Sequence, residues 1–328
     1  MKLLIVVHHR LKLWNVPAWF GERLAMDFPE LQVVQLDSYE GVEPHLRDAE
    51  LIFTISLKPE QFKIARSLKW IHAPTAAVHQ FMFPELVEGK VVLTNSREVH
   101  GPVVAEHVMA MIFALAKKIP QAVIFQQKSK WGQEEIWYDG LHPREIAGAT
   151  LGLIGIGSIG SRVAQMASSL GMRVLAVREH VEKEKPEGVS EVFPPSELDT
   201  MLRQSDYVVL AAPLMPSTTG LINAQRLAAM KKEGCLINVG RGPQVEEASL
   251  AAALRSGRIA GAALDVFDRE PLPSGSPLWS VPNLLITPHT AGLTEKLWHR
   301  HYALFSGNLR RYLSKRPLQF IVDKRRGY

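Results

Sequence analysis

Three side chains with complementary chemistry occur in the C-terminal third of the sequence: Arg241, Glu270 and His289. The reduction of a 2-keto acid needs a cation that anchors the carboxylate and polarises the carbonyl, and an acid that delivers a proton as hydride arrives. Arg241 suits the first task because its planar fork binds two oxygens at once. His289 suits the second because its pKa lies near neutrality, and Glu270 can orient the imidazole and keep it protonated.

Each of these residues also has a structural reading. Arg241 can be a cation that caps a strand end, and Glu270 can be a solvated loop acid before Pro271. His289 can be a hydrogen-bonded histidine in the turn that follows Pro288. The occurrence of all three in segments that follow strands favours the catalytic interpretation.

A glycine-rich turn predicts a dinucleotide site. Gly155, Gly157 and Gly160 form a G-x-G-x-x-G motif that follows an apolar strand and opens a helix, which is the context this motif requires. The first glycine permits a tight turn, the second lets the backbone approach a pyrophosphate, and the third lets the helix pack on the strand. The alternative, a glycine-rich turn without a ligand, fits this context less well.

The residue after the second strand of this unit favours NADP(H) over NAD(H). Binders of NAD place an acid there to hold the ribose 2′-hydroxyl, whereas Arg178 stands at that position here. A guanidinium holds a 2′-phosphate with two hydrogen bonds. Glu179 keeps the alternative open, since a boundary shifted by one residue would make it the ribose acid, and Arg178 can also be a solvated strand end.

The elements that position these groups are short apolar runs that alternate with helical stretches, a pattern typical of parallel sheets covered by helices. We predict an α/β protein of two Rossmann-like, doubly wound domains with an active-site cleft between them. Residues 1–98 with 290–328 would bind substrate, and 99–289 the dinucleotide. The predicted strands are 3–7, 31–36, 51–55, 70–73 and 91–94, then 151–155, 173–177, 207–211, 235–239, 261–264 and 284–287; one helix is expected to open at Gly101 and Pro102 and to continue to 116, and another over 293–313.

Composition and charge narrow the function classes. Hydrophobic residues make up 46% of the 328 positions, which is typical of a soluble globular protein with two domains. Cys235, the single cysteine, allows no internal disulfide and fits a reducing compartment. The apolar run 3–7 is too short for a signal-peptide core or a membrane span. We therefore expect a cytoplasmic protein without a membrane partner.

The net charge of +5 indicates a basic enzyme rather than a nucleic-acid binder. The basic residues are scattered apart from 324–326, and no aromatic-interleaved basic motif occurs, so no nucleic-acid partner is predicted. The histidines at 8–9 and 299–301 lack the H-E-x-x-H spacing of zinc enzymes, and no metal site is predicted.

The stretch from 234 to 292 resembles the signature region of the NAD(P)-dependent D-2-hydroxyacid dehydrogenase family. The loop 212–218 is similar to that family's P-L-T-x-x-T segment, with Met215 in place of the first Thr, and Glu246 stands where Asp is usual. The similarity also includes the segment 104–107 and extends over nearly the whole chain.

The resemblance implies the catalytic roles already argued for Arg241, Glu270 and His289. Asp265, which directly follows a predicted strand, is expected to bind the nicotinamide carboxamide. The full set expected at the cofactor is Gly155, Gly157, Ser158, Ile159, Gly160, Arg178, Pro213, Thr218, Val239, Gly240, Arg241, Asp265 and His289.

In this family, backbone N–H groups of a loop after a strand bind the substrate carboxylate, and the segment 74–79 aligns with that loop. Ala76, Ala77 and Arg241 are therefore the expected substrate-binding residues. Ala77 replaces a usual Gly, so its N–H stays useful only if the residue avoids a positive φ. His79 replaces a usual Asp, and we expect it to face outward.

The predicted reaction converts a 2-keto acid and NAD(P)H into a D-2-hydroxy acid, with glyoxylate and hydroxypyruvate as the leading substrates. The resemblance also implies a homodimer joined through the helix after Gly101. One alternative is a dinucleotide-sensing protein, because some relatives act as corepressors. Phosphoglycerate and formate oxidation are other chemistries of the family, and no residue specifically favours them.

Overall fold

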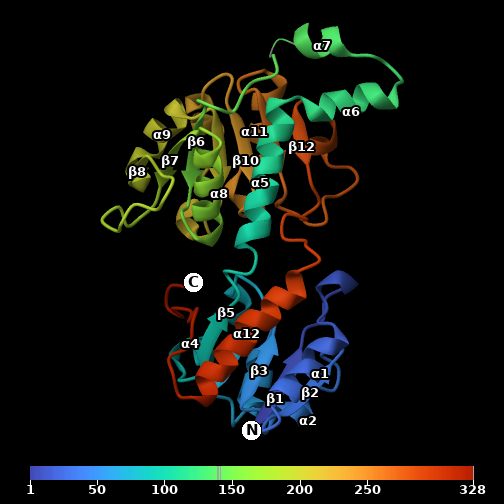
Figure 1. The fold of residues 1–328 in the computed structure, drawn as a ribbon, viewed down its shortest axis with the longest axis vertical. Helices are drawn as coiled ribbons and strands as arrows, with labels where there is room; N and C mark the ends of the chain where they lie inside the picture. Colours follow the sequence, from blue (N-terminus) through green and yellow to red (C-terminus); the bar gives the residue numbers. More distant parts are fainter. Residues whose placement is uncertain (139, 141, 328) are drawn as a thin grey trace. The chain divides into compact units, whose positions relative to one another are not determined.

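The computed structural model describes residues 1–138, 140 and 142–327 and divides into two compact units (Figure 1). The split unit comprises Met1–His100 and Thr294–Tyr328, and the central unit comprises Gly101–Leu293. The boundaries predicted after residues 98 and 289 lie near these positions. The roles assigned to the two domains, and the cleft between them, stay predictions.

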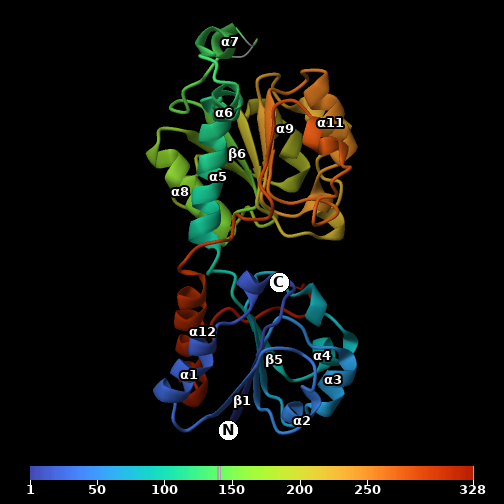
Figure 2. The same ribbon diagram turned by 90° about the vertical axis from the view of Figure 1, so that its right-hand side faces the viewer.

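The split unit is built on a five-stranded parallel sheet with the order β2-β1-β3-β4-β5. This order is the flavodoxin-like form of a doubly wound sheet. Figure 2 shows α1 and α12 on one face and α2, α3 and α4 on the other. The elements are β1 Lys2–Val6, β2 Gln32–Leu36, β3 Leu51–Thr54, β4 Trp70–Ala73, β5 Val92–Asn95, α1 Ala18–Asp27, α2 Glu43–Leu46, α3 Pro59–Ile64, α4 Pro84–Glu88 and α12 Leu297–Leu313.

Strand β1 illustrates why these sequences form central strands. Leu3 and Ile5 pack into the core under α1 and α12, whereas Leu4 and Val6 pack into the core under α2 and α4. A strand covered on both faces needs a continuous apolar run rather than an alternating one. Each fully buried leucine or isoleucine contributes about 1.5–3 kcal/mol through the hydrophobic effect.

The central unit contains a seven-stranded parallel sheet with the order β12-β11-β10-β9-β6-β7-β8. The chain reverses direction across the sheet between β6 and β9, which makes that position the switch point where ligands bind. The elements are β6 Thr150–Ile154, β7 Arg173–Val177, β8 Glu191–Phe193, β9 Tyr207–Leu210, β10 Cys235–Asn238, β11 Gly261–Leu264, β12 Leu284–Ile286, α5 Gly101–Ala116, α6 Ile119–Gln127, α7 Gln133–Tyr138, α8 Ser158–Ser169, α9 Leu198–Gln204, α10 Ala224–Ala229 and α11 Glu247–Arg255.

Two cores sandwich this sheet. Helices α5 and α8 cover one face, and α9, α10 and α11 cover the other, as Figure 2 shows for α5, α8, α9 and α11. The start of α5 lies against α8, because a Cβ placed on Gly101 would stand only 2.4 Å from Ser158 Oγ. The predicted fold class is confirmed by the two parallel, doubly wound sheets.

The predicted strands correspond to observed ones, but β8 was missed. It has three residues, Glu191 is exposed, and a proline follows at position 194, so the segment lacks the apolar run that identifies the other strands. No single helix in the described chain is long and apolar enough to cross a membrane, although α5 and α6, bent by 67°, pass that test of length and composition as a pair.

Helices α6 and α7 form an apolar arm, defined here as residues 119–138. Figure 1 shows both helices extending away from the central sheet. The large hydrophobic side chains of the arm are exposed to an unusual degree; Trp131, which lies between the two helices, is 87% exposed, and Tyr138 is 76% exposed. Exposed aromatic surface of this kind marks an interaction site in soluble proteins.

Candidate active site

The predicted dinucleotide and catalytic residues of the central unit gather at one edge of its sheet. All strands of this sheet are parallel, so their carboxyl ends share one edge. Each predicted residue lies in a segment that follows one of these strands. These residues are Gly155 after β6, Arg178 after β7, Pro213 after β9, Gly240 and Arg241 after β10, Asp265 and Glu270 after β11, and His289 after β12.

The glycine turn after β6 fits a pyrophosphate. Gly155 has φ +97°, and a Cβ there would meet the Ala212 backbone at 2.8 Å. A Cβ on Gly160 would stand 2.2 Å from the Gly155 carbonyl oxygen, so both positions require glycine. Nothing lies within 4 Å of a Cβ placed on Gly157, and no side chain caps the N-terminus of α8. The free N–H groups and the helix dipole can therefore hold an anion.

The loop after β9 is stiffened by Thr218. The Met215 N–H donates to Thr218 Oγ1 at 2.8 Å, and that hydroxyl donates to the Pro213 carbonyl at 2.9 Å. Gln244 Nε2 lies 3.3 Å from the carbonyl oxygens of Ala212 and Pro213, which ties this loop to the one that carries Arg241. Hydrogen bonds therefore join the loop after β9 to the loop after β10, next to the glycine turn.

Arg241 is braced by two buried amides that sequence reasoning did not select. Its N–H donates to Gln244 Oε1 at 2.8 Å, and Asn238 Nδ2 donates to its carbonyl at 3.1 Å. Asn238 and Gln244 are both fully buried. The guanidinium Nη1 donates to the Gly240 carbonyl at 2.6 Å. Burial lowers the pKa of Arg241, and the charge of Glu270 partly offsets this effect.

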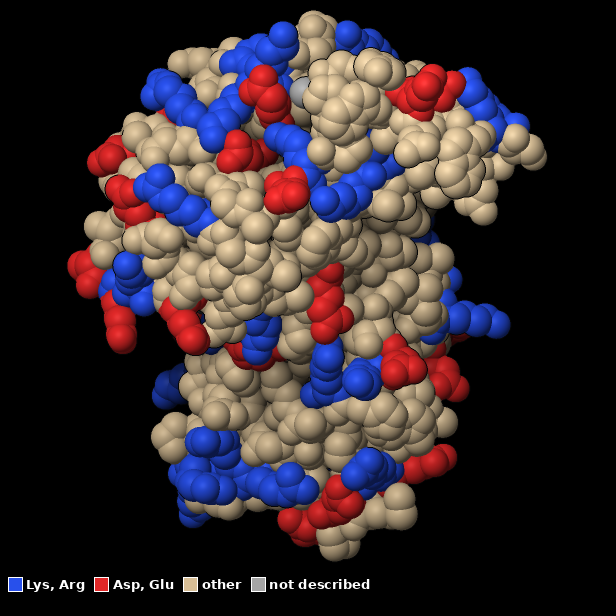
Figure 3. All heavy atoms as spheres, turned by 45° about the horizontal axis from the view of Figure 1, so that its top comes forward, with Lys and Arg blue, Asp and Glu red and all other residues tan. Residues whose placement is uncertain are grey.

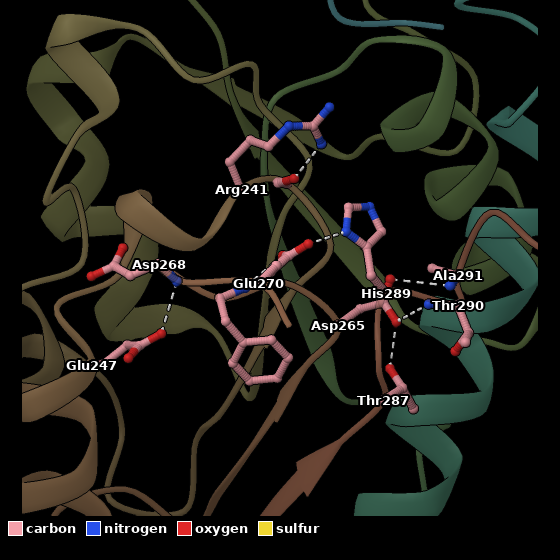
Figure 4. A network of polar contacts seen from close by, with 11 residues as sticks. Arg241, Glu247, Asp265, Asp268, Glu270, Thr287, His289, Thr290 and Ala291 are labelled. Atoms are coloured by element: carbon pink, nitrogen blue, oxygen red, sulfur yellow. Dashed lines mark hydrogen bonds and ion pairs between the residues drawn. The ribbon is translucent and has the colours of Figure 1, made fainter. Parts of the chain in front are cut away.

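His289 and Glu270 form a charge-assisted pair (Figure 4). His289 Nδ1 lies 2.5 Å from Glu270 Oε2, and the Phe267 N–H donates to Glu270 Oε1 at 2.9 Å. The hydrogen bond to Glu270 raises the pKa of His289 more than burial lowers it, and the charges of Glu270 and Asp265 raise it further. Burial raises the pKa of Glu270, but its hydrogen bonds to His289 and Phe267, together with the charges of His289 and Arg241, lower that pKa overall.

The other imidazole nitrogen is available for chemistry. His289 Nε2 has no hydrogen-bond partner among the described residues, and the His289 side chain is 49% exposed. In protonated His289, Nδ1–H donates its hydrogen bond to Glu270. The proton that this imidazolium can transfer to a substrate is therefore the one on Nε2. The arrangement therefore provides a general acid held in a fixed orientation.

The carboxylate of Asp265, expected to bind the cofactor, already has hydrogen-bond partners within the protein. Its side chain is 2% exposed and accepts hydrogen bonds from the hydroxyl of Thr287 and the N–H groups of Thr290 and Ala291. These bonds leave acceptor capacity only on Oδ2. The predicted contact with a nicotinamide carboxamide stays a prediction.

The Arg178 guanidinium is partly engaged within its own loop. Its Nη2 donates to the carbonyl oxygens of Lys183 and, at 3.1 Å, of Glu184. Its backbone N–H donates to the Phe193 carbonyl of β8 at 3.1 Å, while Glu179 is exposed. The backbone of Arg178 is therefore hydrogen-bonded to β8, and its guanidinium holds the loop from 178 to 184 through the two carbonyl groups.

The segment expected to bind a carboxylate lies after β4 in the split unit. The carbonyl oxygens of Thr75, Ala76 and Ala77 accept hydrogen bonds from Ser96 N–H, Asn95 Nδ2 and Thr75 Oγ1. Within the described chain, the N–H groups of Ala76 and Ala77 make no such bond. Ala77 is not among the residues with positive φ, and His79 is exposed as expected.

Comparisons with known proteins identify the family. The model of the D-isomer specific 2-hydroxyacid dehydrogenase NAD-binding domain matches residues 109–291. A glyoxylate reductase of Thermofilum pendens is 33% identical, with 88% of this chain and 85% of that protein covered. The chain belongs to the D-isomer specific 2-hydroxyacid dehydrogenase family. The predicted family and enzyme class, an NAD(P)-dependent oxidoreductase acting on CH–OH donors, are thereby confirmed.

Other members of the D-isomer specific 2-hydroxyacid dehydrogenase family agree with this result. A glyoxylate/hydroxypyruvate reductase B of Serratia proteamaculans is 34% identical, covering 86% of this chain and 87% of that protein. The structure of a family member from Xanthobacter autotrophicus in complex with NADPH and MES superimposes with a TM-score of 0.84 at 30% identity, covering 100% and 99% of the two chains. The sensor alternative is not favoured.

The pH dependence of this dehydrogenase follows from the His289–Glu270 pair. The predicted role of His289 as the proton donor requires a protonated imidazole, so the rate of reduction is expected to fall as the pH rises through the elevated pKa of that residue. Replacing Glu270→Gln removes the carboxylate, and the fall in kcat/KM should begin at lower pH. The measurement is the pH profile of kcat/KM for keto-acid reduction.

Glu247→Gln is the matched control for Glu270→Gln. The Glu247 carboxylate accepts from the Asp268 N–H at 2.9 Å and makes no contact with His289 (Figure 4). Its profile should coincide with that of the unmodified enzyme. A Glu270→Gln profile that also coincides would show that the carboxylate does not set the pKa of His289.

Proposed function

We propose that this dehydrogenase reduces a small 2-keto acid with NADPH to the D-2-hydroxy acid, and that glyoxylate and hydroxypyruvate are its leading substrates. The observation that carries the proposal is the His289–Glu270 pair at 2.5 Å, at the sheet edge that also holds Arg241 and the glycine turn. The printed names of the Thermofilum and Serratia relatives support the substrate class.

The proposed roles follow from the chemistry of each group. Arg241 anchors the substrate carboxylate and polarises the carbonyl. His289 gives the proton on Nε2 to the carbonyl oxygen as its carbon is reduced, and Glu270 stabilises the protonated imidazole before transfer. The bound dinucleotide supplies the hydride that the carbonyl carbon receives.

The dinucleotide is proposed to lie across the switch point between β6 and β9. Its pyrophosphate would be held by Gly157, Ser158, Ile159 and Gly160 at the start of α8, because these N–H groups are uncapped. The remaining proposed contacts come from loops that follow neighbouring strands. They are Gly155, Arg178, Pro213, Thr218, Val239, Gly240, Arg241, Asp265 and His289.

The preference for NADP(H) is proposed on Arg178. Nη2 of Arg178 already donates hydrogen bonds to two carbonyl groups. Nη1, together with the loop that these bonds hold in place, would therefore bind the 2′-phosphate. The NADPH named in the complex of the Xanthobacter relative supports this preference. Glu179, which is exposed, is not needed in this arrangement.

Replacing Arg178→Asp is expected to lower the ratio of kcat/KM with NADPH to that with NADH by about ten- to a hundredfold. A charge-assisted hydrogen bond is replaced by repulsion of the phosphate, whereas the new carboxylate can accept from a ribose hydroxyl. Arg203→Asp, at an exposed position on α9, is the matched control. An unchanged ratio in Arg178→Asp would remove this residue from the 2′-phosphate site.

In the split unit, the free N–H groups of Ala76 and Ala77 are proposed to bind the substrate carboxylate. The loop carbonyls are occupied by hydrogen bonds from Thr75, Asn95 and Ser96, which leaves only donors for a ligand. A donor-only loop is suited to an anion rather than to a neutral group.

We propose that the enzyme is a cytoplasmic homodimer that uses the apolar arm with α5 as its interface. The exposed arm side chains Val123, Ile124, Trp131, Trp137 and Tyr138 support this, since such surface is costly in a monomer. Light scattering should give twice the chain mass of 36.6 kDa. On the face shown in Figure 3, acidic and basic side chains are interspersed, which supports the proposal that no nucleic acid binds there.

A further inference from the structure

The loop that carries His289 has a backbone conformation that needs support. His289 has φ +53°, in the left-handed region that a residue with a side chain seldom adopts. Such residues persist only where their surroundings over-determine them. The His289 N–H donates to the carbonyl oxygens of Asp265 and Thr287, each at 3.0 Å. These bonds fix the N–H of His289, but they leave the side chain of Thr287 and the N–H groups that follow His289 to other partners.

The Asp265 carboxylate clamps the loop on both sides of His289. Before it, the Thr287 hydroxyl donates to Oδ1 at 2.6 Å. After it, the N–H groups of Thr290 and Ala291 donate to Oδ1 and Oδ2 at 2.8 and 3.0 Å. Figure 4 shows the three donors converging on this one carboxylate, with the imidazole of His289 directed away from it toward Glu270.

A third residue completes the clamp from a rigid helix. His107 Nε2 lies 3.1 Å from Thr287 Oγ1 and 3.7 Å from Asp265 Oδ1. The single hydroxyl proton of Thr287 points to the carboxylate, which can only accept, so the hydroxyl must accept from His107. His107 Nε2 therefore carries a proton, and the hydrogen bonds run from imidazole to hydroxyl to carboxylate.

His107 lies on the packed helix α5. This helix has 16 residues, and Val108 and Met109, which follow His107, are buried in the core against α8 and the sheet. The His107 side chain is half-buried at 21% exposure and emerges from that packed helix. The loop after β12 is thereby attached to a helix that lies 180 residues away in the sequence.

We propose that His107 and Thr287 are positioning residues for the reaction, which act through Asp265 to hold His289 in its left-handed conformation against Glu270. None of the three needs to touch the substrate for this role. The inference rests on the proposed function of His289 as the proton donor. It predicts that the hydroxyl of Thr287, rather than the volume of its side chain, sets the acidity and rate of the catalytic imidazole.

The pair Thr287→Val and Thr287→Ser tests this directly. Valine keeps the shape but loses the hydroxyl, and serine keeps the hydroxyl. Thr287→Val is expected to lower kcat by about ten- to a hundredfold with little change in NADPH affinity, because a displaced acid transfers its proton poorly. Thr287→Ser should stay within about threefold of the unmodified enzyme, since it keeps the hydrogen bond that matters.

The pKa of His289, followed by NMR and assigned by the signal lost in His289→Gln, is the second readout. It should fall toward the ordinary value of about 6.5 in Thr287→Val but not in Thr287→Ser. This readout needs no turnover, so it separates a failure of this inference from a failure of the proposed function. Equal rates and equal pKa values in the two variants would overturn the inference.

A second pair covers the case in which Thr287→Val does not fold. In His107→Gln, the amide Nε2 can still donate to the Thr287 hydroxyl, whereas His107→Leu provides no donor. Rescue by glutamine of both the rate and the His289 pKa is expected. Equal loss in the two His107 variants would show that only the shape of the histidine matters and would overturn the proposal.

Discussion

Replacing His289→Ala is expected to lower kcat for keto-acid reduction about a thousandfold, the typical contribution of a positioned general acid. The imidazole Nε2 has no hydrogen-bond partner among the described residues, and the hydrogen bond to Glu270 raises the pKa of His289, which favours the protonated form. The Kd for NADPH, measured by fluorescence titration, should change by no more than about twofold, because the loss falls on the transition state rather than on binding.

His45→Ala, on α2 of the split unit, is the control for this variant and should leave kcat unchanged. Solvent water can replace the proton donor only slowly, so the residual rate of His289→Ala should depend weakly on pH where the native profile falls. A kcat near that of the unmodified enzyme would mean that another group donates the proton.

Replacing Arg241→Met is expected to lower kcat/KM for the keto acid by about a hundred- to a thousandfold, as the loss of a preorganised donor to a developing charge does. The guanidinium is fixed by its bond to the Gly240 carbonyl and by the buried amides that brace its backbone. The loss should be divided between a raised KM and a lowered kcat, since the cation is proposed both to anchor the substrate carboxylate and to polarise the carbonyl in the transition state.

Arg241→Lys separates charge from geometry in that experiment. Lysine keeps the charge but lacks the planar fork, so it should recover only part of the lost activity. Arg203→Met, at the exposed position on α9, is the matched control and should behave as the unmodified enzyme. Full activity in Arg241→Lys would show that the fork makes no two-point contact.

The strands of this fold could be predicted because most of them are covered on both faces. In a strand such as β1, Leu3 to Val6 are all buried, so the sequence contains a continuous apolar run. Elements with one exposed face have an alternating or periodic pattern instead. The edge strand β8 has one buried residue, Phe193, and therefore left no such signal. Helix α5 was expected to open at Gly101 and Pro102, and it begins at Gly101, whose missing side chain permits close packing on α8.

The clustering of the three proposed reacting groups could be predicted for a related reason. Arg241, Glu270 and His289 follow strands in a parallel sheet, and the sheet brings such segments to one edge whatever their separation in sequence. The pair at 2.5 Å between His289 and Glu270 is the consequence. Residue type and strand order were therefore sufficient to place these three residues at one sheet edge, and their catalytic roles stay a proposal.

The groups that hold the reacting residues could not be predicted in this way. Asn238 and Gln244 brace Arg241, and Thr287 with His107 braces the loop of His289, through hydrogen bonds whose geometry no spacing encodes. Asn238 ends β10 and Thr287 follows β12, so a polar type at a strand end is the signal that these two leave, whereas Gln244 and His107 lie elsewhere. Arg178 was selected for its charge, yet its bonds to carbonyls of the following loop emerge only from the fold.

The most direct test of the central claim is the loss of reduced-nicotinamide absorbance when the purified protein is mixed with NADPH and a panel of 2-keto acids. The panel contains glyoxylate, hydroxypyruvate and larger aliphatic and aromatic keto acids, each repeated with NADH and with His289→Ala as the blank. The proposed function predicts rapid oxidation of NADPH with a small keto acid, slower oxidation of NADH, and almost none in the variant. Tight binding of NADPH without turnover of any keto acid would contradict it.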